Sequence, residues 1–228
     1  KSVTKVVSIG APIELRVAPK KARRIYITDT EINHLAHNLS KPTDVIIPTH
    51  FIDNLAGPLM KKKCRFHRID GLHGHVHLHP HIRPSSICNP PKVLIRRLIG
   101  NGIHDREEIV SIPREWHEGL DITNADENQY AENPWDLTTK ISQMDGVITQ
   151  SVTLASEAVL LGVPTLLVSK AERGFLHRLV DGGYPLFIAR DAEESIFAAW
   201  LAGLHLTDAL EEPDWPNTRS ELIDFIKD

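Results

Sequence analysis

The stretch DGVITQSVTLASEAVLLGVPTLLVSK, residues 145–170, decides the fold class of this chain. It predicts a short buried strand at 146–149, a polar turn at 150–153, an almost wholly apolar helix and a second buried strand at 165–168. Gly162 and Pro164 separate the helix from the second strand, as glycine past a helix end and a following proline usually do. A strand–helix–strand unit that is apolar on all sides indicates a parallel sheet covered on both faces. In such sheets ligands bind outside the carboxyl ends of the strands, often at a helix N-terminus.

Glu157 is the only charged residue between Asp145 and Lys170, and it lies within the apolar helix. An ionised carboxylate in such surroundings needs a partner, because burying it alone is costly. A ribose diol would supply two hydroxyl donors to its two oxygens. A salt bridge to an arginine or lysine elsewhere in the fold would serve equally well, so the residues alone leave both interpretations open.

The composition is that of an ordinary globular protein, with 228 residues, 25% charged and 41% hydrophobic. The chain is long for one domain and short for two. A net charge of −4 gives no electrostatic footprint for nucleic acid. The two cysteines, Cys64 and Cys88, form no CxxC pair and indicate a reducing compartment. Without an apolar run near the ~20 residues that span a bilayer, and without a signal peptide, the expected location is the cytoplasm.

Strands and helices are predicted to alternate along the chain, which is an α/β pattern. The first half has expected strands at 5–9, 24–28, 44–47 and 65–69, with helices from Asp29 or Thr30 to Leu39 and at 54–62. The second half has expected strands at 93–99, 108–112, 146–149, 165–168 and 185–189. Its expected helices run from Asn133 to Met144, at 172–181, at 195–204 and at 220–227, and residues 114–133 read as an irregular loop.

Residues 71–91 contain four prolines and two glycines without helical periodicity, which marks a linker. The predicted organisation is therefore an N-terminal domain at 1–72, a linker at 73–91 and a C-terminal domain at 92–228. Histidine alternates through the linker, at positions 73, 75, 77, 79 and 81, and in an extended chain all five would project to one side. Imidazoles suit zinc or nickel, but this spacing matches no zinc site, and a polar face lining an interdomain cleft is the alternative.

Two places suggest that residues are absent from the sequence. The chain begins at Lys1, without a methionine, and enters a strand directly. The strand-like runs KVLIRRLI and EEIVSIP are joined by fewer than the ~12 residues that a parallel crossover requires. Either these strands are antiparallel or a segment near His104–Arg106 is missing, and we favour the second explanation.

The loop after the first strand of the C-terminal domain is a second candidate ligand contact. Gly100, Asn101 and Gly102 could present backbone N–H groups to a phosphate, although Asn-Gly is also an ordinary turn. His104 and Asp105, which follow, are either site residues or polar loop residues.

Several segments together resemble a largely uncharacterised, mainly archaeal family known as domain of unknown function three-five-four. They are ITDTEINHLAHNLS, PTDVIIPTHF, LHPHIRP and NPWDLTTKISQMDGVITQSVTLASEAVLLGVPTLLV, in the expected order over most of the chain. Thr28–Glu31 and Thr153–Ala158 are the most specific parts, supported by Leu78–Pro80 and by His104-Asp105. That family resembles the GT-B glycosyltransferases and the UDP-N-acetylglucosamine 2-epimerases.

The resemblance implies two Rossmann-like domains of GT-B type facing across a cleft, with a nucleotide-sugar in the C-terminal one and the N-terminal, acceptor-side domain incomplete. Members carry an N-terminal strand and loop with an acceptor-side histidine, and a helix after the His-Asp pair, that this sequence lacks. In relatives the glutamate matching Glu157 binds the ribose, and the turn matching Gln150–Thr153 approaches the diphosphate. The expected nucleotide-sugar contacts are therefore Gly100, Asn101, Gly102, Gln150, Ser151, Val152, Thr153 and Glu157.

The expected function is transfer of a hexosyl or N-acetylhexosaminyl group from a nucleotide-diphosphate sugar, such as a UDP-sugar, to an unknown acceptor. The helix N-terminus would supply the positive potential, so no metal or other cofactor is expected. His104 and Asp105 are the catalytic candidates. A homodimer is one expected assembly. A sugar-nucleotide 2-epimerase would share the donor pocket and draw its acid and base from His104, Asp105, His117 and Glu118. A non-catalytic nucleotide-binding or scaffold protein is the third hypothesis.

Overall fold

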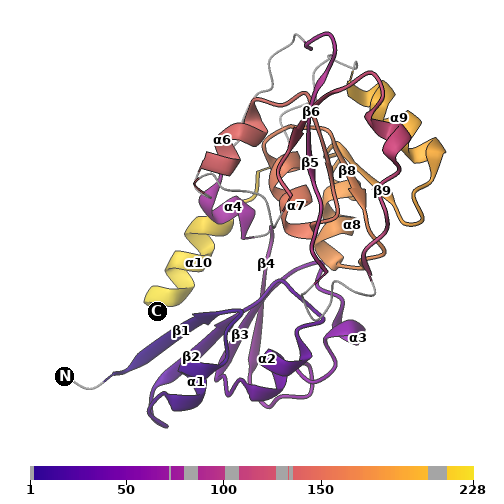
Figure 1. The fold of residues 1–228 in the computed structure, drawn as a ribbon. Coiled ribbons are helices and arrows are strands. Elements are labelled where there is room, and N and C mark those ends of the chain that lie inside the picture. Colours follow the sequence, from indigo (N-terminus) through magenta and orange to yellow (C-terminus); the bar gives the residue numbers. More distant parts are fainter. Residues whose placement is uncertain are drawn as a thin grey trace. The chain divides into compact units, whose positions relative to one another are not determined.

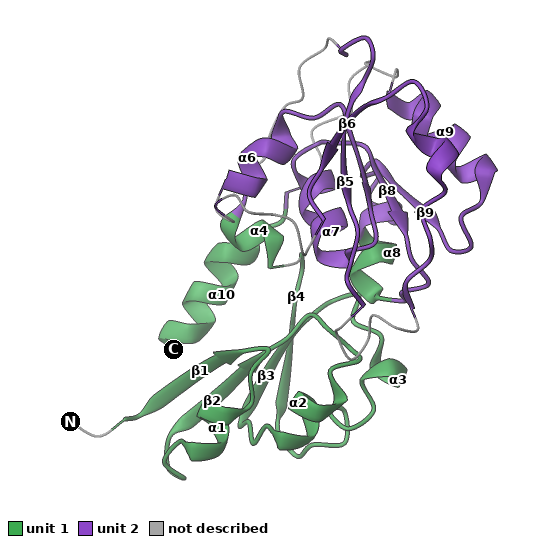
Figure 2. Cartoon of the chain, viewed as in Figure 1, with its two compact units in different colours: residues 1–77, 173–178, 216–228 green, residues 78–172, 179–215 purple. Residues whose placement is uncertain are grey.

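The computed structural model describes residues 3–71, 73–79, 87–100, 108–126, 133, 136–204 and 215–228. Its strands form one four-stranded and one five-stranded sheet, each with every pairing parallel (Figure 1). The sheets belong to two compact units (Figure 2). Unit 1 comprises residues 1–77, 173–178 and 216–228, and unit 2 comprises residues 78–172 and 179–215. The predicted α/β class with Rossmann-like sheets is confirmed.

Unit 1 is built on a sheet whose strands lie in chain order, β1-β2-β3-β4. The strands are β1 (Lys5–Ile9), β2 (Arg23–Ile27), β3 (Asp44–Pro48) and β4 (Arg65–Ile69). Its helices are α1 (Ile13–Val17), α2 (His34–Leu39), α3 (Asp53–Ala56), α4 (Gly74–His77) and α10 (Thr218–Lys227). Since every strand is parallel to its neighbour, all four carboxyl ends lie at one edge of the sheet.

Both faces of this sheet are covered, because successive strand residues point to opposite sides. Tyr26, Val45 and Ile47 pack with residues of α1 and α3 on one face. Ile25 and Ile46 pack with Leu222 of α10 on the other. Isoleucine and valine are suited to these buried strands, since their branched side chains favour extended backbone and fill the space beneath the helices.

Unit 2 has the strand order β6-β5-β7-β8-β9. The strands are β5 (Lys92–Arg96), β6 (Asp121–Asn124), β7 (Gly146–Thr149), β8 (Thr165–Val168) and β9 (Leu186–Ala189). Its helices are a short 3₁₀ helix (Arg114–His117), α6 (Leu137–Ser142), α7 (Val152–Leu160) and α9 (Glu194–Leu204), while α8 (Gly174–Asp181) begins in unit 1 and ends in unit 2. From β5 the chain goes to β6 on one side and then returns to β7 on the other.

A tryptophan pair packs on one face of the second sheet. Trp116 stacks on Phe197 at 4.6 Å between ring centroids, and its Nε1 donates to Glu194 at 2.7 Å. Trp200 lies in the same cluster and donates from Nε1 to the carbonyl of Pro164 at 3.1 Å. Each indole nitrogen has its acceptor, so these large rings fill the core without leaving a polar atom unsatisfied.

The structure corrects several predicted elements. The helix expected from Asp29 or Thr30 begins only at His34, with Asn33 as its N-cap. The helix expected at 54–62 ends at Ala56, because Gly57 has φ +35° and Pro58 follows.

Residues 108–112 are not a strand of the sheet; Ile109 makes a single antiparallel bridge to Ser169. The chain instead reaches β6 after residues 97–120, which removes the crossover problem that had suggested a missing segment. The loop predicted at 114–133 contains that strand and the 3₁₀ helix, and the helix expected from Asn133 starts at Leu137.

The compact units differ from the predicted domains. The segments Arg173–Arg178 and Pro216–Asp228 group with unit 1, although both were expected in the C-terminal domain. Part of the expected linker is helix α4 of unit 1.

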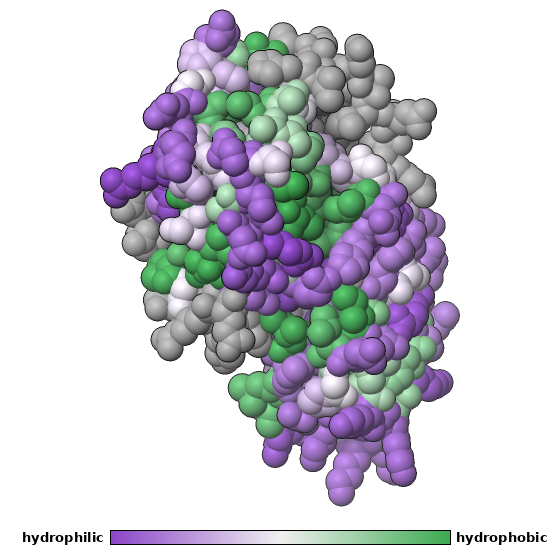
Figure 3. All heavy atoms as spheres, turned by 90° about the vertical axis from the view of Figure 1, so that its right-hand side faces the viewer, coloured by the Kyte–Doolittle hydropathy of each residue, from purple (hydrophilic) through white to green (hydrophobic). Residues whose placement is uncertain are grey.

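Hydrophilic side chains cover much of the face shown in Figure 3, and hydrophobic side chains come to the surface between them in separate patches. Over the described ranges, no helix combines the length and apolar character needed to cross a membrane.

Candidate functional site

The reversal of direction between β5 and β7 defines a switch point in the unit 2 sheet. Parallel register places Arg96, at the end of β5, beside Thr149, at the end of β7. The connections that leave these two carboxyl ends diverge to opposite sides, and open α/β sheets bind ligands in the crevice at such a point. The predicted contacts Gly100 and Gln150–Thr153 follow these two strands, so the topology brings their loops to one edge of the sheet.

The turn after β7 is held by its own side chains. The Gln150 side chain is buried; its Oε1 accepts from the backbone N–H of Leu98 at 2.8 Å and its Nε2 donates to the carbonyl of Val110 at 2.7 Å. Thr149 Oγ1 accepts from the N–H of Ser151 at 2.9 Å. Gln150 therefore ties this turn to the two neighbouring segments.

Helix α7 begins at the switch point and is capped by Ser151, whose hydroxyl accepts from the N–H of Leu154 at 3.3 Å. The N–H groups of Val152 and Thr153 belong to the first turn, where an α-helix supplies no intrahelical acceptor. The positive end of the helix dipole lies at the same place. This part of the turn can therefore receive an anion.

We expect Ser151→Ala to lower the free energy of unfolding of unit 2 by about 1 kcal/mol, the usual cost of losing an N-cap. Tryptophan fluorescence in a urea titration measures it, because all four tryptophans of the sequence fall within the unit 2 ranges. Ser156→Ala is the matched control, since that hydroxyl donates to the Thr153 carbonyl within the helix and caps nothing. Equal losses in the two variants would contradict the capping role.

Glu157 lies on the accessible side of α7. The helix buries Leu154, Ala155, Ala158 and Val159, while Thr153 is exposed and Glu157 is half-buried. Residues four apart share a helix face, so Thr153 and Glu157 form one accessible stripe leading from the helix N-terminus.

The segment after β5 contributes charge to the same sheet edge. The Arg97 guanidinium pairs with Asp126 at 3.0 Å and donates to His117 Nε2 at 3.2 Å. Burial and the charges of Arg97 and Arg114 lower the pKa of His117. His117 thus ends the 3₁₀ helix as an arginine partner, and Glu118, which follows it, is exposed.

Gly100 has φ +77°, which favours glycine. Asn101, Gly102, His104 and Asp105 lie outside the described residues, so their predicted roles stay predictions.

In unit 1 the Thr28–Glu31 segment follows β2 at the carboxyl edge of the sheet. Asp29 Oδ2 lies 2.9 Å from His73 Nδ1, and the hydroxyl of Thr30 donates to Oδ1 at 3.2 Å. Burial alone would raise the pKa of Asp29, but the hydrogen bond and charge of His73, with the Thr30 hydroxyl, outweigh it and lower that pKa.

Glu31 is fully buried and joins two other segments of unit 1. Its Oε1 accepts from the N–H of Ile52 at 3.1 Å and from the N–H of Gly174 at 2.9 Å. Burial raises the pKa of this carboxyl, with the two N–H donors opposing the shift. Gly174 is required there, because a Cβ would stand 1.6 Å from the carbonyl oxygen of His50.

The prediction that the linker histidines lie in an extended chain is wrong for the residues that the structure describes. His73, directly before helix α4, and His77, at its end, stack with 5.3 Å between ring centroids, while His75 within the helix is buried. The three rings therefore do not project to one side, since helical backbone separates alternate residues. His79 is exposed, and His81 lies outside the described residues.

Sequence reasoning singled out Thr28–Glu31 as a motif but assigned no site residue in it. The signal was available, because two acids directly after a buried strand lie where parallel sheets bind ligands. Comparison of the chain with models of known families, with curated proteins and with solved structures finds no match.

Proposed function

We propose that unit 2 binds a nucleotide-diphosphate sugar at the switch point between β5 and β7, and that the protein is a GT-B-type glycosyltransferase. The observation that carries the proposal is the register of Arg96 with Thr149, which brings the loop after β5 and the N-terminus of α7 to one sheet edge. The GT-B arrangement, with donor and acceptor domains facing across a cleft, is part of the proposal.

The diphosphate occupies the first turn of α7. The N–H groups of Val152 and Thr153 and the helix dipole stabilise its negative charge, and they stabilise it further as it leaves the sugar. The accessible stripe from Thr153 to Glu157 then leads one helical turn onward. The Glu157 carboxylate accepts the two ribose hydroxyls.

Calorimetry with UDP, GDP and ADP tests the donor site. We expect one nucleoside diphosphate to bind and Glu157→Ala to weaken it about ten- to hundredfold, the usual effect of losing hydrogen bonds to a charged group. Asp121→Ala is the matched control, because this exposed acid opens β6 at the amino edge of the sheet, away from the switch point. The donor site is refuted if none of the three binds, or if both variants weaken binding equally.

Turnover separates transfer from the alternatives that share the pocket. Incubation of UDP-N-acetylglucosamine without acceptor yields an epimer or free 2-acetamidoglucal from an epimerase, and unchanged substrate from a transferase. Binding without turnover across a panel of sugar nucleotides and cell extract would indicate a non-catalytic protein.

A further inference from the structure

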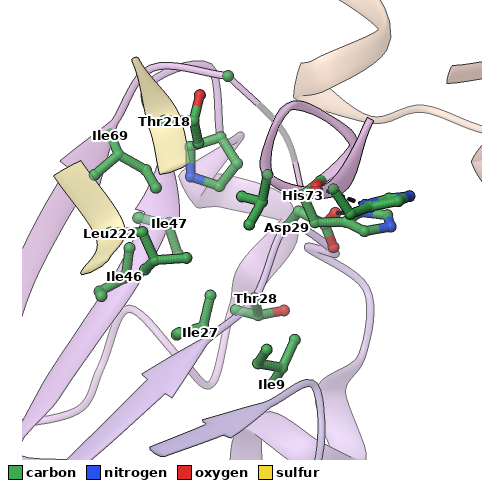
Figure 4. A pocket seen from close by; sticks show the side chains of 14 residues that line it. Ile9, Ile27, Thr28, Asp29, Ile46, Ile47, Ile69, His73, Thr218 and Leu222 are labelled. Atoms are coloured by element: carbon green, nitrogen blue, oxygen red, sulfur yellow. Dashed lines mark hydrogen bonds and ion pairs between the residues drawn. The ribbon is translucent and has the colours of Figure 1, made fainter. Parts of the chain in front are cut away.

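A cavity of about 380 Å³ lies within unit 1, between the sheet and helices α4 and α10 (Figure 4). Its wall is apolar: the strands contribute Ile9, Ile27, Ile46 and Ile69, and α10 contributes Leu222. Asp29 and His73 lie together at one side of it in Figure 4. The volume falls within the ~300–1,000 Å³ of small-molecule sites, which are mostly apolar with a few polar groups that fix orientation.

The cavity has a closed end and an open end. Ile46 is 1% exposed and Leu222 is 9% exposed, whereas Ile9 is 70% exposed. Ile46 and Leu222 pack in one core cluster, whereas the apolar wall near Ile9 is accessible to water. An apolar molecule that bound beside Ile9 would remove this wall from water, which is favourable.

Asp29 is the charged acceptor at this site. The hydroxyls of Thr28 and Thr218 also line the cavity, but they donate to the backbone carbonyls of Thr30 and Asp70, at 3.4 and 2.7 Å. Each carboxylate oxygen can accept two hydrogen bonds. Asp29 can therefore accept from a ligand while keeping its bonds to His73 and Thr30.

We propose that this cavity binds a small amphipathic alcohol, with its apolar body among the isoleucines and its hydroxyl donating to Asp29. A neutral head fits better than an ammonium, because an ammonium is far more costly to desolvate and would compete with His73 for the carboxylate. This site lies wholly in unit 1 and does not depend on nucleotide binding by unit 2.

Methyl NMR of the full chain with ¹³C-labelled isoleucine δ1 groups tests the proposal, using 1-octanol as the probe. We expect saturable shifts at Ile27, Ile46 and Ile69, and none at Ile95 and Ile148 in the core of unit 2. Methyl octyl ether, which cannot donate, should bind at least tenfold more weakly, and octylammonium should also bind more weakly than the alcohol.

Two variants separate the contribution of the hydrogen bond to Asp29 from that of the apolar wall. Asp29→Asn should weaken octanol about tenfold and leave the ether unchanged, whereas Asp53→Asn, an acid outside the cavity lining, should leave both unchanged. Leu222→Trp should fill the closed end and abolish the octanol shifts while the unit 2 methyl signals stay in place.

Three outcomes overturn the proposal: no saturable shifts with octanol, equal shifts in both units, or octanol binding that Asp29→Asn and Leu222→Trp leave intact. Tighter binding of octylammonium than of octanol would contradict the inference that the ligand's polar group is neutral.

Discussion

We expect the free energy of unfolding of unit 1 to fall by at most about 5 kcal/mol as the pH is lowered from 6.5 to 4. The cause is a pair of histidines, His37 on α2 and His75 on α4, which are 0% and 4% exposed. Burial lowers the pKa of each to about 4; the charge of His34 adds to the effect at His37, and Arg178 adds to it at His75, where Asp70 opposes it. Both imidazoles are therefore neutral in the folded protein at pH values where they are charged in the unfolded chain.

The sign follows from the protons bound in each state. Between pH 4 and the unfolded pKa near 6.5 the unfolded chain binds more protons, so stability rises with pH across this window and is fully present above it. One pKa unit corresponds to 1.36 kcal/mol, so each histidine contributes about 3 kcal/mol. Glu31 acts in the opposite direction, because its raised pKa makes the folded state bind the extra proton above the usual glutamate pKa. The wild-type slope is therefore shallower than the histidine pair alone would give.

Urea unfolding followed by hydrogen exchange measures this effect separately in each unit, using peptides from β2 and β3 against peptides from β7 and β8. His37→Leu should remove about 1.4 kcal/mol per pH unit from the slope in unit 1, and His75→Gln a similar amount. Leucine suits position 37, because the side chain is fully buried and packs against the ring of Tyr26. His50→Gln, at an exposed site of unit 1, is the control. An unchanged slope in the double variant would contradict the prediction.

The parts of the fold that the sequence predicted best are those whose burial is complete. β7 and β8 have every residue buried, and α7 lies between them, so continuous apolar runs marked all three elements within a residue or two. The strand at Asp121–Asn124 was missed because, among the described strands, it pairs only with β5, and none of its four residues is buried. A polar four-residue strand carries no periodic signal that separates it from a loop.

The site contacts that the sequence did not predict are those between residues far apart in the chain. Asp29 and Glu31 were visible as polar residues after a strand, but their partners His73 and Gly174 lie 44 and 143 residues away. The grouping of Arg173–Arg178 and Pro216–Asp228 with unit 1 likewise depends on tertiary contacts, such as that of Arg178 with Asp70, which a local sequence pattern does not show. The loops after β5 and β7 were proposed as ligand contacts from the glycine-bracketed loop and from the helix start; the strand order that brings them to one sheet edge comes from the structure.

Asp44→Ala should lower the free energy of unfolding of unit 1 by about 3 kcal/mol, since it removes a fully buried carboxylate from a charged network. Asp44, the first residue of β3, is 0% exposed. Its oxygens accept from Arg65 at 2.8 Å, from Arg23 at 3.4 Å and from the Thr43 hydroxyl at 2.7 Å. Burial alone would raise the pKa of this carboxyl, but these partners outweigh it and lower the pKa.

The same network also contacts the C-terminal helix α10. Asp44→Ala is therefore expected to affect this helix as well as β3. Arg23 donates to the carbonyl of Phe225 on α10 and stacks over its ring, 4.5 Å from the centroid. Loss of Asp44 releases Arg23, so hydrogen exchange should quicken in residues 218–227 as well as in β3. Asp53→Ala is the matched control, because that carboxylate pairs with Arg68 but is 49% exposed, and an exposed pair is worth at most about 1 kcal/mol. If Asp44→Ala costs no more than Asp53→Ala and leaves exchange in α10 unchanged, Asp44 does not organise this end of the sheet.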